Sequence, residues 1–244
     1  MERFRYFLRD NGFRESTTDT YIQRAVKYLE FAGTDKPTQD ALDRFRTVLH
    51  AKNLARNTIN NYCIAAKAYH TMRGEQVSFP FLKISDAIPN YFSQEDILEI
   101  FFVVNNFKHY VMLQTIFYGC LRASELCALN VEDVDLNSLT IMIRDGKGGR
   151  DGISYINDQC ARILKRYIQI KPDFEIEGQK PLFFTDYGAR WDRTSLYHIF
   201  EKYRKKAGVE KRGGLTCICT PYASHNYDRQ RLRSPNRERS LEAS

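Results

Sequence analysis

The stretch that decides the fold is 117–126, which reads Phe-Tyr-Gly-Cys-Leu-Arg-Ala-Ser-Glu-Leu. Apolar side chains recur at helical spacing before it, and those of 126–129 continue the spacing after it. We therefore predict two helices that meet near Gly119, with Arg122 at or near their junction. A guanidinium at such a position can bind two oxygens of one phosphate. The simpler interpretation is an ion pair between Arg122 and Glu125, three residues further on.

A predicted β-hairpin follows these helices. Residues 141–156 read Ile-Met-Ile-Arg-Asp-Gly-Lys-Gly-Gly-Arg-Asp-Gly-Ile-Ser-Tyr-Ile, with alternating segments on either side of a glycine-rich turn. Lys147 stands in this turn. A loop lysine between glycines is ordinarily a solvated surface charge, so the order of the two features, more than the lysine itself, indicates a function.

In this order the two features resemble the catalytic domain of the tyrosine recombinases, the phage-integrase family. The family's first motif reads Thr-Gly-Leu-Arg-x-Ser-Glu-Leu and its hairpin reads Gly-Lys-Gly-x-Lys-x-Arg, and the match lies within 121–126 and 146–148. The resemblance implies that Arg122 holds the non-bridging oxygens of a scissile phosphate and that Glu125 orients the active-site scaffold. Lys147 would protonate the leaving 5′-oxygen after attack by a tyrosine hydroxyl. The family needs no metal and no cofactor for this reaction.

The composition limits the class of protein. The 244 residues are 43% hydrophobic, with a net charge of +7 and a pI near 9.0. A chain of this length can bury a core, and a basic, aromatic-rich surface favours a polyanionic partner, with double-stranded DNA as the leading candidate. A surface kept basic only for solubility is the alternative.

The sequence also indicates a compartment. It contains no apolar run long enough to span a membrane and no signal peptide, so we expect a cytoplasmic protein without a membrane partner. The six cysteines lack Cys-x-x-Cys spacing. We therefore expect reduced thiols, with neither a disulfide framework nor a zinc site.

We expect 1–82 to form a small DNA-clamping domain of four helices. Arg24 and Lys27 are interleaved with the apolar positions of its second helix, and Arg56 begins the fourth. These three side chains are the predicted DNA contacts of the domain. The layout, with an Asn-Thr-Ile-Asn-Asn-Tyr helix start at 57–62, also resembles the SAM-like core-binding domain of the same recombinases.

The predicted fold class is mainly α, with this four-helix domain followed by an α+β catalytic domain that contains a small β-hairpin or sheet. Residues 79–90 contain two prolines and no helical periodicity, so we place a linker at 83–92 and an incomplete catalytic-like domain at 93–214. Helices are expected at 160–170 and 195–207, and 181–184 is expected to be a short buried strand.

The C-terminal residues do not continue the resemblance. The family next has a His-x-x-Arg box, a later His or Trp, and a nucleophilic tyrosine, but 215–244 contains none of these in recognisable form. His225 and Arg229 are four residues apart, and Tyr222 and Tyr227 crowd around that histidine. The nucleophile is therefore unknown. Because large aliphatic residues are nearly missing after Cys219, we expect the tail, 215–244, to be disordered.

Three functions follow as hypotheses. The first is a tyrosine recombinase or integrase that self-associates on DNA for integration or site-specific recombination, and is inactive in strand cleavage as the sequence stands. The second is a catalytically dead DNA-binding protein that occupies recombination sites. The third is a basic helical protein in which Arg122 and Lys147 are only surface charges. A reading-frame break after Gly214 is a further hypothesis, because degenerate codons for 220–222 and 227–231 can encode the family's Arg-His-Thr and Met-x-x-Asn-Gly in a shifted frame.

Overall fold

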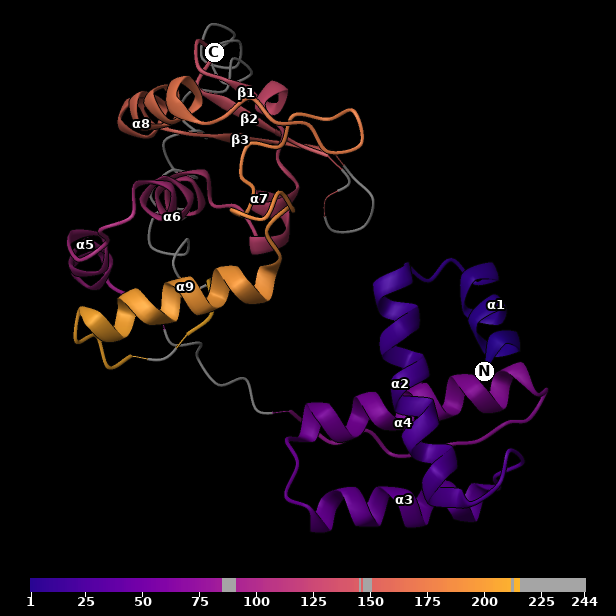
Figure 1. Cartoon of the computed structure of the whole chain (residues 1–244). Helices are drawn as coiled ribbons and strands as arrows, with labels where there is room; N and C mark the ends of the chain where they lie inside the picture. Colours follow the sequence, from indigo (N-terminus) through magenta and orange to yellow (C-terminus); the bar gives the residue numbers. More distant parts are fainter. Residues whose placement is uncertain (85–90, 145, 147–150, 212, 216–244) are drawn as a thin grey trace, which may run out of the picture. The chain divides into compact units, whose positions relative to one another are not determined.

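Figure 1 shows the computed structural model of the chain, which describes residues 1–84, 91–144, 146, 151–211 and 213–215. The chain divides into two compact units, Met1–Ala87 and Ile88–Ser244, which are described separately below. The predicted fold class is confirmed, because the described residues are mainly helical and the second unit contains a small antiparallel sheet.

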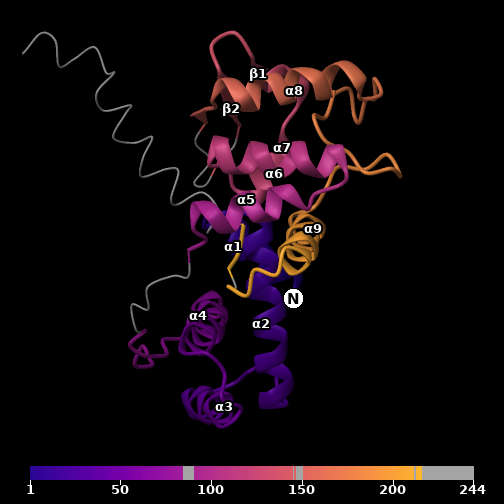
Figure 2. The same ribbon diagram turned by 90° about the vertical axis from the view of Figure 1, so that its left-hand side faces the viewer.

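Four helices build the first unit, and they are α1 (Glu2–Asp10), α2 (Glu15–Ala32), α3 (Gln39–Ala51) and α4 (Arg56–Met72). Helices α3 and α4 run side by side, and α2 crosses both of them (Figures 1 and 2). Tyr28 of α2, Phe45 of α3 and Ile59 of α4 are buried at this crossing. Gly33 follows the last residue of α2, and with a left-handed backbone (φ 65°) its N–H donates to the carbonyl of Leu29 and caps the helix.

The segment after α4 is bound back to the helices by two amide side chains. Gln39 donates to the carbonyl of Ser78 (2.9 Å) and accepts from its N–H (3.0 Å). Asn60 makes the same pair of contacts with Leu82, at 3.0 and 2.9 Å. Each amide therefore pairs both the N–H and the carbonyl of one residue in this segment.

The second unit has a longer order of elements, which are α5 (Gln94–Phe102), α6 (Phe107–Gly119), α7 (Ala123–Ala128), the 3-10 helix η1 (Val131–Asp133), β1 (Val134–Asp135), β2 (Thr140–Ile143), β3 (Gly152–Tyr155), α8 (Asp158–Ile170) and α9 (Arg193–Lys206). Its sheet is antiparallel in the order β1-β2-β3. The predicted hairpin is confirmed, with Ile141 opposite Ser154 and Ile143 opposite Gly152. Strand β1 was not expected.

The expected strand at 181–184 is wrong in part. These residues are largely buried, as predicted, but they form only isolated bridges, from Pro181 to Asn130 and from Phe184 to Arg190. Each bridge joins a single pair of residues, so no ladder develops. The apolar run is buried because Phe183 packs on Tyr167, with ring centroids 5.2 Å apart.

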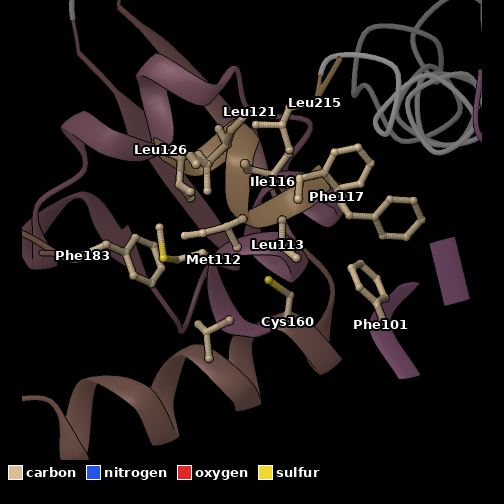
Figure 3. Close-up of a cluster of buried hydrophobic side chains, with 14 of the residues drawn as sticks. Phe101, Met112, Leu113, Ile116, Phe117, Leu121, Leu126, Cys160, Phe183 and Leu215 are labelled. Carbon is tan, nitrogen blue, oxygen red and sulfur yellow. The ribbon is translucent and has the colours of Figure 1, made fainter. Parts of the chain in front are cut away.

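Helix α6 is the centre of the second unit. It lies between a layer made of the sheet and α8 and a layer made of α5 and α9 (Figures 1 and 2). Every side chain from Val111 to Phe117 is buried, as expected for a helix covered on all sides. Figure 3 shows this core, in which Leu215 joins the same buried cluster as Leu121. Leu215, which falls within the expected tail, is therefore part of the core.

Candidate functional site

Arg122 lies directly before α7, at the helix junction that the sequence predicts. Helix α6 ends at Gly119, and Cys120 then takes a left-handed conformation (φ 48°) that turns the chain. A Cβ atom at Gly119 would lie 3.2 Å from the Leu121 side chain and 3.5 Å from the Ser154 hydroxyl, so the end of α6 packs closely against both residues. Because Leu121 is buried in the core, the backbone of Arg122 is fixed at the edge of that core.

The ion pair between Arg122 and Glu125 is present, and its two partners differ strongly in exposure. The Arg122 side chain is 56% exposed, whereas the Glu125 side chain is only 7% exposed. One Glu125 oxygen accepts from Arg122 Nη1 (2.6 Å), and the other accepts from the Arg122 backbone N–H (2.8 Å). A guanidinium has five N–H donors. The carboxylate thus anchors the arginine from the protein side and leaves an exposed fork that can bind an oxyanion.

The base of the hairpin lies against the same junction. The Ser154 hydroxyl on β3 donates to the carbonyl of Gly119, the last residue of α6. The structure therefore connects the helix junction to the strands that precede and follow the glycine-rich turn. Lys147, the predicted proton donor, lies outside the described residues.

Four residues that were not assigned to the site form a polar network at the other end of α7. Arg190 donates to the carbonyl of Ala128 (3.2 Å) and to the side chain of Asn130. The Asn130 N–H donates to one oxygen of Asp133 (2.8 Å), and Arg144 Nε donates to the other (2.6 Å). The hydrogen bond to Asp133 raises the pKa of Arg144, which stays charged. The Asn-x-x-Asp spacing of a helix start was the available sequence signal.

In the first unit, two of the three predicted DNA contacts meet on one aromatic ring. The Arg24 guanidinium carbon and Lys27 Nζ each lie 6.0 Å from the ring centre of Tyr62, and Lys27 also donates to the Tyr62 hydroxyl (3.3 Å). Arg56 does not join them in any recorded contact. It is exposed at the start of α4 and donates to the carbonyl of Lys83 (3.0 Å).

Two buried cysteines of the second unit have protonated thiols. Burial raises the pKa of the Cys127 thiol to about 11 and that of Cys160 to about 12, so both stay protonated at neutral pH. In the part of the chain that the structure describes, no three His, Cys, Asp or Glu side chains are grouped to hold a metal ion. No helix there is both long and apolar enough to cross a membrane. The tail residues considered as box or nucleophile lie outside the described residues, and they are Tyr222, His225, Tyr227 and Arg229.

Comparison with known proteins gives a consistent picture. Residues 90–225 match the model of the phage integrase family. The chain is 27% identical over 217 residues to the tyrosine recombinase XerA of Pyrococcus horikoshii, covering 86% of this chain and 73% of that protein. It is 26% identical over 234 residues to the tyrosine recombinase XerD of Oceanobacillus iheyensis, covering 86% of this chain and 78% of that protein.

Solved structures are similar to this chain in fold. The Tn1549 transposon integrase in complex with a circular intermediate DNA has a TM-score of 0.68 at 18% identity, covering 89% of this chain and 83% of that one. Lambda integrase bound to DNA has a TM-score of 0.67 at 12% identity, with 89% and 81% covered. At such low identity these likenesses establish the fold and no more.

Proposed function

Because the chain belongs to the phage integrase family, we propose that it binds double-stranded DNA as a protein of the tyrosine recombinase class, in DNA integration or site-specific recombination. The observation that carries the proposal is the exposed guanidinium of Arg122, anchored by the buried carboxylate of Glu125. Further support comes from the net charge of +7 and from the DNA complexes solved for integrases of similar fold.

The proposed chemistry is charge stabilisation at phosphorus. In the family reaction a tyrosine oxygen forms a bond to the scissile phosphorus, the bond to the 5′-oxygen breaks, and a 3′-phosphotyrosyl link results. Arg122 would hold two non-bridging oxygens as their charge grows, with Glu125 fixing its orientation. Lys147 would donate its proton to the leaving 5′-oxygen. Loss of one such stabilising group costs about a hundredfold to a thousandfold in rate.

The first unit would serve as a DNA clamp. Arg24 and Lys27 share the ring of Tyr62, which limits the freedom that both side chains lose when they contact phosphates. Arg56 uses one nitrogen on the carbonyl of Lys83, and its remaining donors are available for a phosphate. We also propose self-association on DNA, which would appear as successive shifted bands as protein concentration rises.

We propose that the chain, with this sequence, does not cleave DNA strands. The reason is that 215–244 offers no recognisable His-x-x-Arg box and no nucleophile in family context. That composition equally favours the alternative, a catalytically dead protein that occupies recombination sites. An active recombinase and a dead protein that occupies recombination sites would both bind DNA, and only the active enzyme would form a covalent adduct with it.

A gel-shift and a covalent-adduct assay on the same DNA test the proposal. The wild-type chain should bind DNA and form no adduct, Arg122→Ala should bind more weakly, and Arg122→Lys should recover charge without the two-pronged contact. No binding at low salt would refute the proposed function. An adduct from the wild-type chain would refute its inactivity and make Tyr222 and Tyr227 the first tyrosines to replace.

A further inference from the structure

A second arginine in the chain is held in the same way as Arg122. Arg144 donates Nε to Asp133 (2.6 Å), and the arginine side chain is 60% exposed while the aspartate side chain is 3% exposed. The second oxygen of Asp133 accepts a backbone N–H at the start of η1, from Asn130. The second oxygen of Glu125 accepts a backbone N–H at the start of α7 in the same manner.

This combination separates the two arginines from the other ion pairs of the described residues. Arg44 is 67% exposed, but its partner Asp40 is 74% exposed, so the pair is an ordinary surface contact. Arg204 and Glu201 are both largely buried and hold the end of α9 together. Among the pairs recorded for the described ranges, an exposed arginine on a deeply buried carboxylate occurs at Arg122 and Arg144.

The position of Arg144 relates it to the proposed site. It directly follows β2, so it is the first residue of the turn that carries Lys147 in the sequence. The buried Asp133 that holds it belongs to the segment that leaves α7, the helix that Arg122 begins. The anchor is fixed in turn by Asn130, whose side chain accepts from Arg190.

We infer that Arg144 is a further DNA-phosphate contact of this protein and that Asp133 is its positioning residue. The inference rests on the proposed function and adds a residue to it. A buried carboxylate must keep its partner, so Asp133 holds the Arg144 stem in place before any ligand arrives. The Arg144 side chain is 60% exposed at the start of the hairpin turn, where an oxyanion can reach it in competition with the exposed Glu132, which lies 3.7 Å from Nη2.

The first experiment measures how DNA affinity of the full chain depends on salt. Arg144→Gln keeps an amide donor for Asp133 but removes the charge. It should lower the slope of log K against log salt by about 0.9, the value for one phosphate contact in duplex DNA. Arg44→Ala is the matched control, an arginine of similar exposure without a buried anchor, and should leave the slope unchanged. An unchanged slope for Arg144→Gln, or an equal fall for Arg44→Ala, would overturn the inference.

The second experiment separates positioning from charge. Asp133→Asn and Glu132→Gln each remove one negative charge from adjacent residues, but Glu132 is exposed and lies 3.7 Å from Arg144. Releasing the anchored side chain should make Asp133→Asn bind DNA about three- to tenfold more weakly than Glu132→Gln, the cost of ordering one long side chain. The salt slopes of the two variants should agree, because both retain Arg144. Equal affinities would remove the positioning role.

These outcomes can be told apart from failure of the proposed function. If the wild-type chain binds DNA and Arg144→Gln matches it, only the inference on Arg144 is lost. If Arg122→Ala leaves the slope unchanged while Arg144→Gln lowers it, the proposed role of Arg122 is lost and Arg144 stands. Far-ultraviolet circular dichroism on each variant verifies the fold. If Asp133→Asn loses helix, the result for Arg144→Gln alone decides whether Arg144 contacts a phosphate.

Discussion

Replacing Glu125 tests the anchor on which the proposed site depends. Its carboxylate is buried and accepts two hydrogen bonds from Arg122, one from the backbone and one from the guanidinium. Glu125→Gln keeps the volume and one acceptor but presents an N–H donor to one of these two donors. Glu125→Ala removes both acceptors and the buried methylene groups.

The expected cost follows from these contacts. An acceptor lost from the start of a helix costs about 1 kcal/mol. An ion pair whose arginine is more than half exposed adds only about 0.5 kcal/mol. Removing the buried methylene groups adds about 1.5 kcal/mol. We therefore expect the free energy of unfolding of the second unit to fall by about 1 kcal/mol in Glu125→Gln and about 3 kcal/mol in Glu125→Ala.

The chain provides its own probe for this measurement. Trp191 is the single tryptophan, and it packs on His109 within the second unit. Its fluorescence during urea unfolding therefore reports the second unit without interference from the first. Glu99→Gln, which changes an exposed glutamate of the same unit, is the control and should stay within about 0.5 kcal/mol of wild type. If Glu125→Ala lowers the free energy of unfolding no more than this control does, the Glu125 carboxylate does not hold Arg122 in position for a phosphate.

Four further outcomes are expected. Replacing Arg24 and Lys27 together by alanine should lower the salt slope of DNA binding by about 1.8, and an unchanged slope would place DNA elsewhere. Hydrogen bonds from the start of α9 lower the pKa of Asp192 to about 2, so its stabilisation is complete above its usual value of 3.8 and lost as pH falls toward 2. The difference in Tm between wild type and Asp192→Ala should shrink over that range, and a constant difference would contradict this. Burial, together with nearby lysines, lowers the pKa of His109 below its usual value of 6.5. Because the unfolded chain then binds the proton more readily, the wild type should lose stability as pH falls below 6.5, and His109→Gln should lose less. Parallel pH profiles of the two proteins would contradict this. Finally, the nucleotide sequence after codon 214 should stay open in the shifted frame past codon 244 and reach a tyrosine in an apolar helix, whereas an early stop in that frame would refute the break.

Local patterns predicted those features whose cause is local. The helix junction at Arg122 follows from apolar spacing interrupted by Gly119, and the hairpin follows from alternation around a glycine-rich turn. Strand β1 has two residues, which is too short for any periodic signal. The apolar run at 181–184 predicted burial correctly. A strand also needs a neighbouring backbone to pair with along its length, and this run pairs only through isolated bridges.

The anchoring carboxylates show most clearly what sequence leaves open. Glu125 is three residues from its arginine, so the pair could be proposed from helical spacing alone. Asp133 is eleven residues from Arg144 and meets it only because β1 and β2 fold back on each other. The Asn-x-x-Asp spacing marks Asp133 as a partner of the helix start, but it does not show that Asp133 is buried beneath Arg144 while Glu132 beside it is exposed, since that difference arises from tertiary packing.

An anchored guanidinium carries a physical signature that separates it from an ordinary surface charge. A free arginine loses side-chain entropy when it binds phosphate, whereas Arg122 and Arg144 lose it during folding, when Glu125 and Asp133 are buried. The guanidinium then stands between the carboxylate and the solvent, so the buried negative charge is screened from an approaching phosphate. Stability and DNA affinity must therefore fall together in variants of the two carboxylates. At a surface pair such as that of Arg44 neither should change, and a carboxylate variant that lost stability but kept full affinity would separate the anchor from the site.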